Sequence, residues 1–163
     1  MSTAPTSLEL TFQPTVDLIS STRRFVCAFY APLLGDPDLL SRVGLATHEL
    51  LENVLKYATD GRSSARVRLD GEGAEQKLTI ETTSTVTAER RARLEEIFAE
   101  MAGSPDPFEY YQQTMRRSLE RHHGSGLGLA RVWAEAEMVL TIEFLGDTVT
   151  IAATANVKDQ PSS

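Results

Sequence analysis

The sequence predicts an α+β fold, a two-layer sandwich in which one mainly antiparallel (mixed) sheet carries helices on one of its faces. Two observations predict this class. Stretches that alternate apolar and polar residues, as half-buried strands do, occur near both ends and in the middle of the chain. The stretches with apolar residues at helical spacing are grouped between them, whereas a parallel sheet would need strands and helices to alternate. The expected order of elements is β-α-α-β-β-α-α-α-β-β.

The first strand and the first two helices follow from patterning and from one turn signal. Residues 8–13, LELTFQ, alternate and are expected to form a strand. Apolar residues at helical spacing predict a helix over residues 16–34. The sequence Gly-Asp-Pro at 35–37 ends this helix. A second helix is expected to run from there to the DGRSS turn, with Asp36 or Asp38 as its N-cap.

The remaining elements comprise two hairpins with three helices between them. The segment DGEGAEQ separates two alternating stretches and predicts the first hairpin, and Gly146-Asp147 predicts the turn of the last one. The expected strands of the first hairpin are 65–69 and 77–82, the expected helices are 87–102, 107–121 and 127–136, and the last hairpin spans 138–157.

Composition and charge exclude several classes of function. The formal net charge is −7 and the sequence pI is about 5.0, so long-range electrostatics oppose binding to a nucleic-acid backbone. A single cysteine, Cys27, excludes a disulfide framework within the chain. No apolar run reaches the length of a membrane span, and the first residues lack a signal-peptide pattern, so we expect a cytoplasmic protein. The length predicts a single domain, 1–163, with flexible ends.

A glycine-rich segment precedes the last predicted helix. In GSGLGLA, glycines at alternate positions let the backbone approach a ligand closely, and the first N–H groups of a helix favour an anion. The candidate phosphate-binding residues are Gly124, Ser125, Gly126, Leu127 and Gly128; a flexible entry into the helix is the alternative. The segment is neither a Walker A loop nor a Rossmann loop, because no lysine lies near its first glycine and it follows a helix.

A second candidate site lies on the second predicted helix. Glu49 and Asn53 are four residues apart and therefore share a face, and Lys56 continues the same stripe. The asparagine oxygen is a hard ligand suited to Mg²⁺, and the carboxylate is suited to act as a base. The alternative is a solvated helix face with an ion pair between Glu52 and Lys56. A zincin site is excluded, because position 52 is not a histidine.

Together the two segments resemble the GHKL (Bergerat-fold) ATPase domain over roughly residues 8–155. HELLENVLKYA resembles its N-box, which implies that Glu49 is the catalytic base and Asn53 the Mg²⁺ ligand, and Lys56-Tyr57 matches a Lys-Tyr pair common in sensor kinases. GSGLGLA resembles the box that borders the ATP lid.

A stand-alone domain of this size resembles the serine/threonine kinases of bacterial partner-switching systems, relatives of anti-sigma factors. The resemblance implies binding of ATP and Mg²⁺ and phosphorylation of a hydroxyl on a small STAS-domain antagonist. It also implies that a homodimer is possible. The apolar segment FVCAFYAPLL is one candidate interface, and the alternative is that this segment packs in the core.

One part of the family pattern is missing. The family has an Asp-x-Gly-x-Gly box after a central strand, whose aspartate reads adenine, but here Thr82, Thr83, Ser84 and Thr85 occupy that place. A hydroxyl can contact adenine directly or through water. The departure motivates a second hypothesis, a binding module that sequesters a regulatory protein without nucleotide turnover. A third, an ATP hydrolase driving conformational change, would need a second domain to move.

Overall fold

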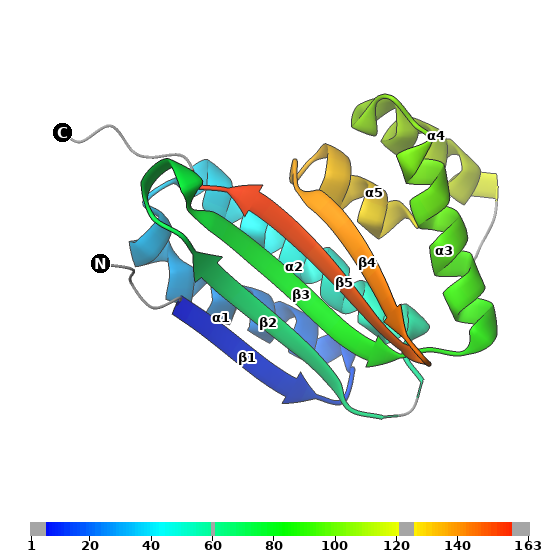
Figure 1. Ribbon diagram of the computed structural model, residues 1–163, viewed down its shortest axis with the longest axis horizontal. Helices are drawn as coiled ribbons and strands as arrows, with labels where there is room; N and C mark the ends of the chain where they lie inside the picture. Colours follow the sequence, from blue (N-terminus) through cyan, green and yellow to red (C-terminus); the bar gives the residue numbers. More distant parts are fainter. Residues whose placement is uncertain (1–5, 60, 121–125, 158–163) are drawn as a thin grey trace.

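The computed structural model describes residues 6–59, 61–120 and 126–157, and within them it confirms the predicted α+β sandwich and order of elements. A five-stranded sheet forms one layer, with helices against one of its faces (Figure 1). The strands are β1 (Thr6–Phe12), β2 (Ser63–Asp70), β3 (Lys77–Thr85), β4 (Val139–Leu145) and β5 (Thr148–Asn156). The helices are α1 (Val16–Leu34), α2 (Pro37–Tyr57), α3 (Ala88–Ala102), α4 (Pro107–Glu120) and α5 (Leu127–Ala134), with a short 3₁₀ helix, η1 (Gly73–Glu75), between β2 and β3.

The sheet has the strand order β1-β2-β3-β5-β4, and each pairing between neighbouring described strands is antiparallel. Every second residue of β2, β3 and β5 is buried, as expected when one face is covered by helices. Leu78, Ile80 and Ile151 are among the residues that form this buried face.

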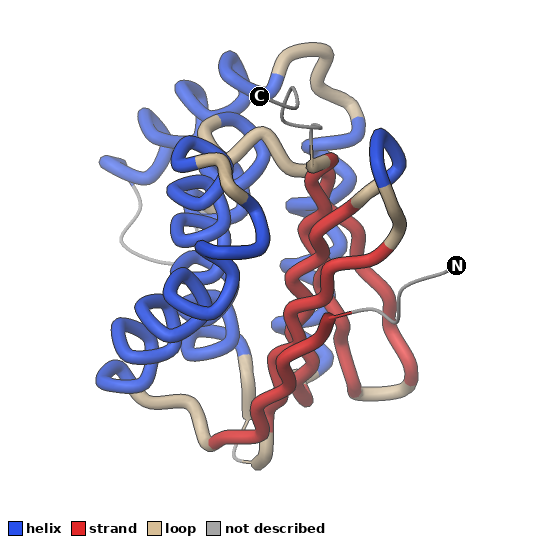
Figure 2. Tube along the Cα trace, turned by 90° about the vertical axis from the view of Figure 1, so that its left-hand side faces the viewer, coloured by secondary structure: helices blue, strands red, loops and turns tan. Residues whose placement is uncertain are grey.

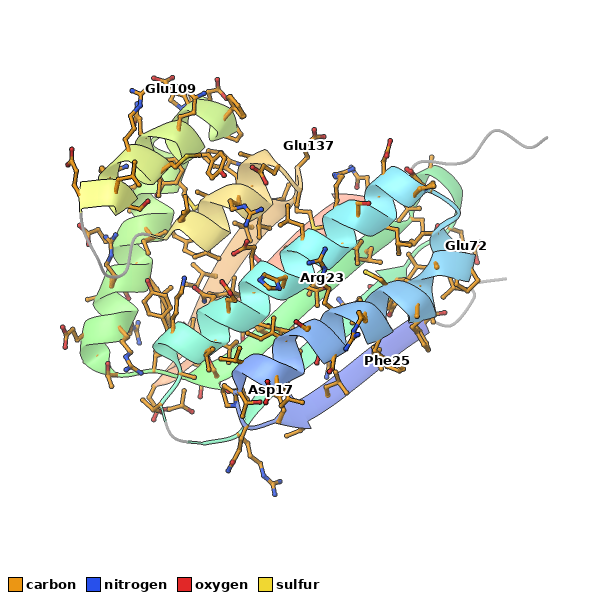
Figure 3. The ribbon with its side chains drawn as sticks, turned by 180° about the vertical axis from the view of Figure 1, so that it is seen from behind. Asp17, Arg23, Phe25, Glu72, Glu109 and Glu137 are labelled. Carbon is orange, nitrogen blue, oxygen red and sulfur yellow. The ribbon has the colours of Figure 1, made fainter. Side chains whose placement is uncertain are left out.

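Helices α1 and α2 lie across the covered face of the sheet, as the view from behind shows (Figure 3). Gly35 ends α1 with a φ of 64°, the left-handed conformation that glycine adopts most easily. The carboxylate of Asp36 then accepts hydrogen bonds from the amides of Asp38 and Leu39, at 2.9 and 3.3 Å. Of the two N-caps left open by the sequence, Asp36 is therefore the cap of α2.

Helices α3, α4 and α5 pack together at the β4 side of the sheet (Figures 1 and 2). The rings of Tyr110 on α4 and Trp133 on α5 meet edge to face, with centroids 5.9 Å apart. Arg42 on α2 donates hydrogen bonds to the carbonyls of Ala136 and Glu137, at 2.6 and 3.1 Å, just beyond the end of α5. This capping by Arg42 holds α5 beside α2.

Strand β3 is longer than the sequence predicts. The expected end was residue 82, but the strand continues to Thr85 and pairs with β5 along its whole length. Thr82 and Ser84 are buried on the side of the helices, whereas Thr83 lies on the other face and shares a hydrogen bond with Thr150 at 3.1 Å. The segment in place of the Asp-x-Gly-x-Gly box is therefore mostly regular strand.

Helix α1 leaves large apolar side chains on its outer surface. Phe25, labelled in Figure 3, is 50% exposed. Phe29 and Leu33 are also exposed, whereas Val26 and Tyr30 are buried. The segment FVCAFYAPLL thus contributes to both the core and the surface, and a homodimer through it remains a prediction. None of the helices in the described part of the chain combines the length and the apolarity needed to cross a membrane.

Tyr30 links α1 to the edge of the sheet. Its side chain is fully buried, and its hydroxyl donates to the carbonyl of Val67 at 2.7 Å and lies 3.2 Å from that of Thr6. Burial, with a smaller contribution from the Asp70 carboxylate, raises the pKa of Tyr30 to about 12. The phenol is thus kept protonated as a donor to the first two strands.

We predict that Tyr30→Phe lowers the free energy of unfolding by about 1–2 kcal/mol at neutral pH, because it leaves a buried strand carbonyl without its donor. Urea unfolding measures this. Tyr110→Phe is the matched control: Tyr110 is also buried, but its hydroxyl makes a longer bond, 3.5 Å, to Glu100, so the loss should be smaller. Equal losses would contradict the role of Tyr30.

We predict that Tyr30 also makes the free energy of unfolding depend on pH. The pKa of Tyr30 is higher in the folded chain than the ordinary value of about 10, so its stabilising contribution is present below pH ~10 and is lost as the pH rises toward 12. Unfolding free energies measured between pH 8 and 12 should therefore fall less steeply in Tyr30→Phe than in the wild type. Parallel curves would show that Tyr30 does not titrate differently in the two states.

Candidate functional site

The three candidate residues of α2 line a single small pocket. The side chain of Glu49 is only 4% exposed and that of Asn53 only 9%, whereas Lys56 is exposed at the rim. The helix places them on one stripe because their spacings are four and three residues. A buried carboxylate and a buried amide on an otherwise apolar helix face do not fit the alternative of a solvated surface.

The start of α5 forms the other wall of this pocket. Gly126, Leu127 and Gly128 line it together with the α2 residues, and α5 lies beside α2 (Figure 3). The structure thus brings together the described parts of the two segments that the sequence singled out. Gly124 and Ser125, also predicted to bind phosphate, lie outside the described residues.

Two glycines are required where α5 begins. Gly126 caps the helix with a φ of 69°, and a Cβ there would lie 3.0 Å from the side chain of Ile97 on α3. At Gly128 a Cβ would lie 2.6 Å from Oε2 of Glu49. The absence of a side chain at Gly128 is therefore what lets α5 approach the carboxylate on α2.

Arg131, which the sequence analysis did not single out, is the ionic partner of Glu49. Its Nη1 donates to Oε1 of Glu49 at 2.5 Å, and its Nε donates to Glu135 at 3.3 Å. The carboxylate of Glu49 is buried, while the Arg131 side chain remains 36% exposed. A sequence signal existed: an acid on a buried helix face needs a cation, and Arg131 is the basic residue of the segment LGLARVWAEA.

Burial and ion pairing act on Glu49 in opposite directions. Desolvation raises the pKa of its carboxyl above the ordinary value, and the Arg131 guanidinium, the next largest influence, lowers it. The same pair raises the pKa of Arg131 despite the opposing effect of its own burial. A carboxylate with a raised pKa is better matched to accept a proton near neutral pH than an exposed glutamate is.

Tyr57 also lines the pocket, and its hydroxyl is buried and has no hydrogen-bond partner among the residues that the structure describes. Burial raises the pKa of this phenol, so it stays a neutral donor. An unpaired buried hydroxyl is costly, and in native proteins such groups usually meet a ligand or water. Tyr57 is thus a further polar group available to a bound molecule.

The pocket encloses little space in this conformation. Its volume is about 20 Å³, enough for roughly one water molecule. A larger hollow, about 500 Å³, lies between α3 and α4 and is lined by residues such as Glu100 and Arg117, but none of the predicted site residues that the structure describes borders it. A ligand larger than water would therefore require this pocket to widen.

The hydroxyls proposed to replace the adenine-reading aspartate do not line this pocket. Among the described lining residues none comes from β3, although Thr82 and Ser84 are buried on the same side of the sheet as α2. The structure therefore does not bring Thr82, Thr83, Ser84 or Thr85 to the site.

The donor set of the pocket fits a magnesium–phosphate ligand. The amide oxygen of Asn53 and the carboxylate of Glu49 are hard oxygen ligands, and Lys56 supplies a positive charge. The Tyr57 hydroxyl, which has no hydrogen-bond partner within the described part of the chain, adds a neutral donor. These are properties of the residues present, independent of any resemblance.

Comparisons with known proteins give a structural match but no sequence match. No protein-family model matches the chain, and no curated protein sequence matches it. The fold is similar to that of a chain in the crystal structure of the SiaB–SiaC complex from Pseudomonas aeruginosa. The TM-score is 0.64 at 14% sequence identity, over 91% of this chain and 88% of that chain. At this identity the likeness shows the fold.

We predict that Gly126→Ala destabilises the chain by about 1–2 kcal/mol, because an alanine at a φ of 69° is strained and its Cβ presses on Ile97. Thermal or urea unfolding measures the loss. Gly103→Ala is the control, because Gly103 has a φ of −83° and its added Cβ would find its nearest atom at 3.6 Å. If both variants were equally stable, the tight start of α5 would be contradicted.

Proposed function

We propose that this chain binds ATP with Mg²⁺ and transfers the terminal phosphoryl group to a serine or threonine of a small partner protein, of the STAS-domain type, in a partner-switching pathway. The observation that carries the proposal is the pocket itself: Glu49 and Asn53 of α2 face Gly126 and Gly128 of α5 across it. The fold-level likeness to a chain solved in a complex of two proteins supports a protein partner.

The residues of the pocket have separate tasks in this proposal. Asn53 would hold the Mg²⁺ ion, which when bound neutralises charge on the phosphates. Lys56 and the backbone at Gly126 and Gly128 would hold phosphate oxygens. Glu49 would accept the proton of the attacking serine or threonine hydroxyl as that oxygen bonds to the terminal phosphorus and the bond to ADP breaks.

A second candidate function is favoured by the small volume of the pocket. About 20 Å³ does not accommodate a nucleotide, and no residue of β3 is among the described residues that line the pocket. A chain whose pocket stays this small would act as a binding module that sequesters a regulatory protein without nucleotide turnover. The two functions are separated by whether ATP–Mg²⁺ binds.

We predict that ATP with Mg²⁺ raises the melting temperature by about 5–10 °C at a hundredfold excess over its dissociation constant, because the ligand binds only the folded chain. Asn53→Ala should remove the magnesium-dependent part of the shift. Asn156→Ala, which changes an exposed asparagine at the end of β5, should leave it intact. A wild type that shows no shift would favour the binding module over the kinase.

We predict that Glu49→Gln slows phosphoryl transfer by about a hundredfold or more, because a neutral amide cannot take the proton of the hydroxyl. The assay incubates the purified chain with γ-labelled ATP, Mg²⁺ and an extract of the cells that produce it, and follows label on a small protein. Glu52→Gln, on the neighbouring and more exposed carboxylate, is the control and should be close to wild type. Full activity of Glu49→Gln would exclude Glu49 as the base.

A further inference from the structure

Arg131 approaches Glu49 from outside the pocket. Of the described residues, eight line the pocket, and Arg131 is not among them, although its Nη1 lies 2.5 Å from Oε1 of Glu49. The guanidinium therefore holds the carboxylate without lining the pocket itself.

The other oxygen of the carboxylate lies beside the start of α5. Oε2 of Glu49 is packed against Gly128, where a Cβ would approach it to 2.6 Å, and Gly128 lines the pocket. The carboxylate is thus held at one oxygen by Arg131 and bordered at the other by backbone that carries no side chain. This arrangement distinguishes the two oxygens of Glu49.

Arg131 is itself fixed by a second carboxylate. Its Nε donates to Oε2 of Glu135 at 3.3 Å, one turn further along α5. A planar guanidinium can hold two carboxylates at once in a defined geometry, whereas a lysine ammonium is a point charge on a flexible stem. Through Arg131, the position of α5 therefore determines how the Glu49 carboxylate on α2 is oriented.

We propose that Arg131 is a positioning residue for the phosphoryl transfer: it holds Oε1 of Glu49 from outside the pocket, so that Oε2 is the oxygen presented to the reacting hydroxyl. This inference rests on the function proposed above and adds a residue to it. Arg131 acts through Glu49 and does not bind the nucleotide.

The test compares Arg131→Gln and Arg131→Lys in the labelled-ATP assay, with initial rates at a series of Mg–ATP concentrations. In Arg131→Gln we expect kcat to fall about 10–100-fold while KM for ATP changes little, because the base is present but misoriented. Arg131→Lys should recover part of the loss by restoring the charge. Arg66→Gln, which removes an arginine of similar exposure from its pair with Glu9 on the sheet, should keep wild-type kinetics.

The outcomes separate this inference from the proposed function. If the wild type transfers phosphate and Arg131→Gln has an unchanged kcat, or a raised KM with the same kcat, the positioning role is wrong and the kinase stands. If the wild type transfers no phosphate, the proposed function fails and the inference falls with it. If Arg131→Gln has a low kcat but is also unfolded, the Arg131→Lys variant decides between the two causes. For the positioning role to hold, Arg131→Lys would have to recover both the folded state and part of kcat.

A spectroscopic readout on the unliganded chain tests the geometry directly. In chain labelled with ¹⁵N-arginine, the paired guanidinium of Arg131 should show slowed rotation about its C–N bonds. Glu49→Gln should release it, whereas Glu135→Gln should leave the contact with Glu49 in place. A freely rotating Arg131 in the wild type would overturn the inference.

Discussion

The burial of one carboxylate constrains the rest of this structure. Glu49 lies on the covered face of α2, and a charge taken out of water is costly unless it is paired. Its partner, Arg131, is 82 residues away in the sequence, so the pair requires α5 to lie against α2. That approach in turn requires the missing side chain at Gly128 and the left-handed start of α5 at Gly126. The small pocket between α2 and α5 lies beside this contact.

Most of the fold could be predicted because its elements follow local rules. Helix α1 begins and ends where the apolar spacing and Gly35 indicate, and each predicted strand is present. Strands β2 and β3 both run further than predicted, since Ser63, Thr82 and Ser84 fill buried positions with small polar residues and so hide the apolar alternation that marks a strand. The sequence alone does not decide whether Asp36 or Asp38 is the N-cap of α2, because either carboxylate can reach a free amide of the first turn.

The candidate site could be predicted only in part, for a different reason. Glu49, Asn53 and Lys56 share a stripe because of helical geometry, and Gly126 and Gly128 were conspicuous by their spacing. The contact between the two segments is not local, so no pattern within either one reveals it. The charge of Arg131 was a signal in the sequence, but its pairing with Glu49 becomes apparent only when α2 and α5 lie together. The same holds for the buried hydroxyl of Tyr57, which has no partner within the described part of the chain.

The strand order has a consequence for how the pocket is anchored. Strands β3 and β5 are hydrogen-bonded neighbours, and the amide of Val86, just after β3, bonds to the carbonyl of Asp147, just before β5. The segment between these two residues, which includes α5 and β4, therefore has both of its ends fixed at the sheet. One wall of the pocket belongs to this segment, and the other belongs to α2, which precedes β3 in the chain. The pocket thus lies where a segment with two anchored ends meets a helix from an earlier part of the chain.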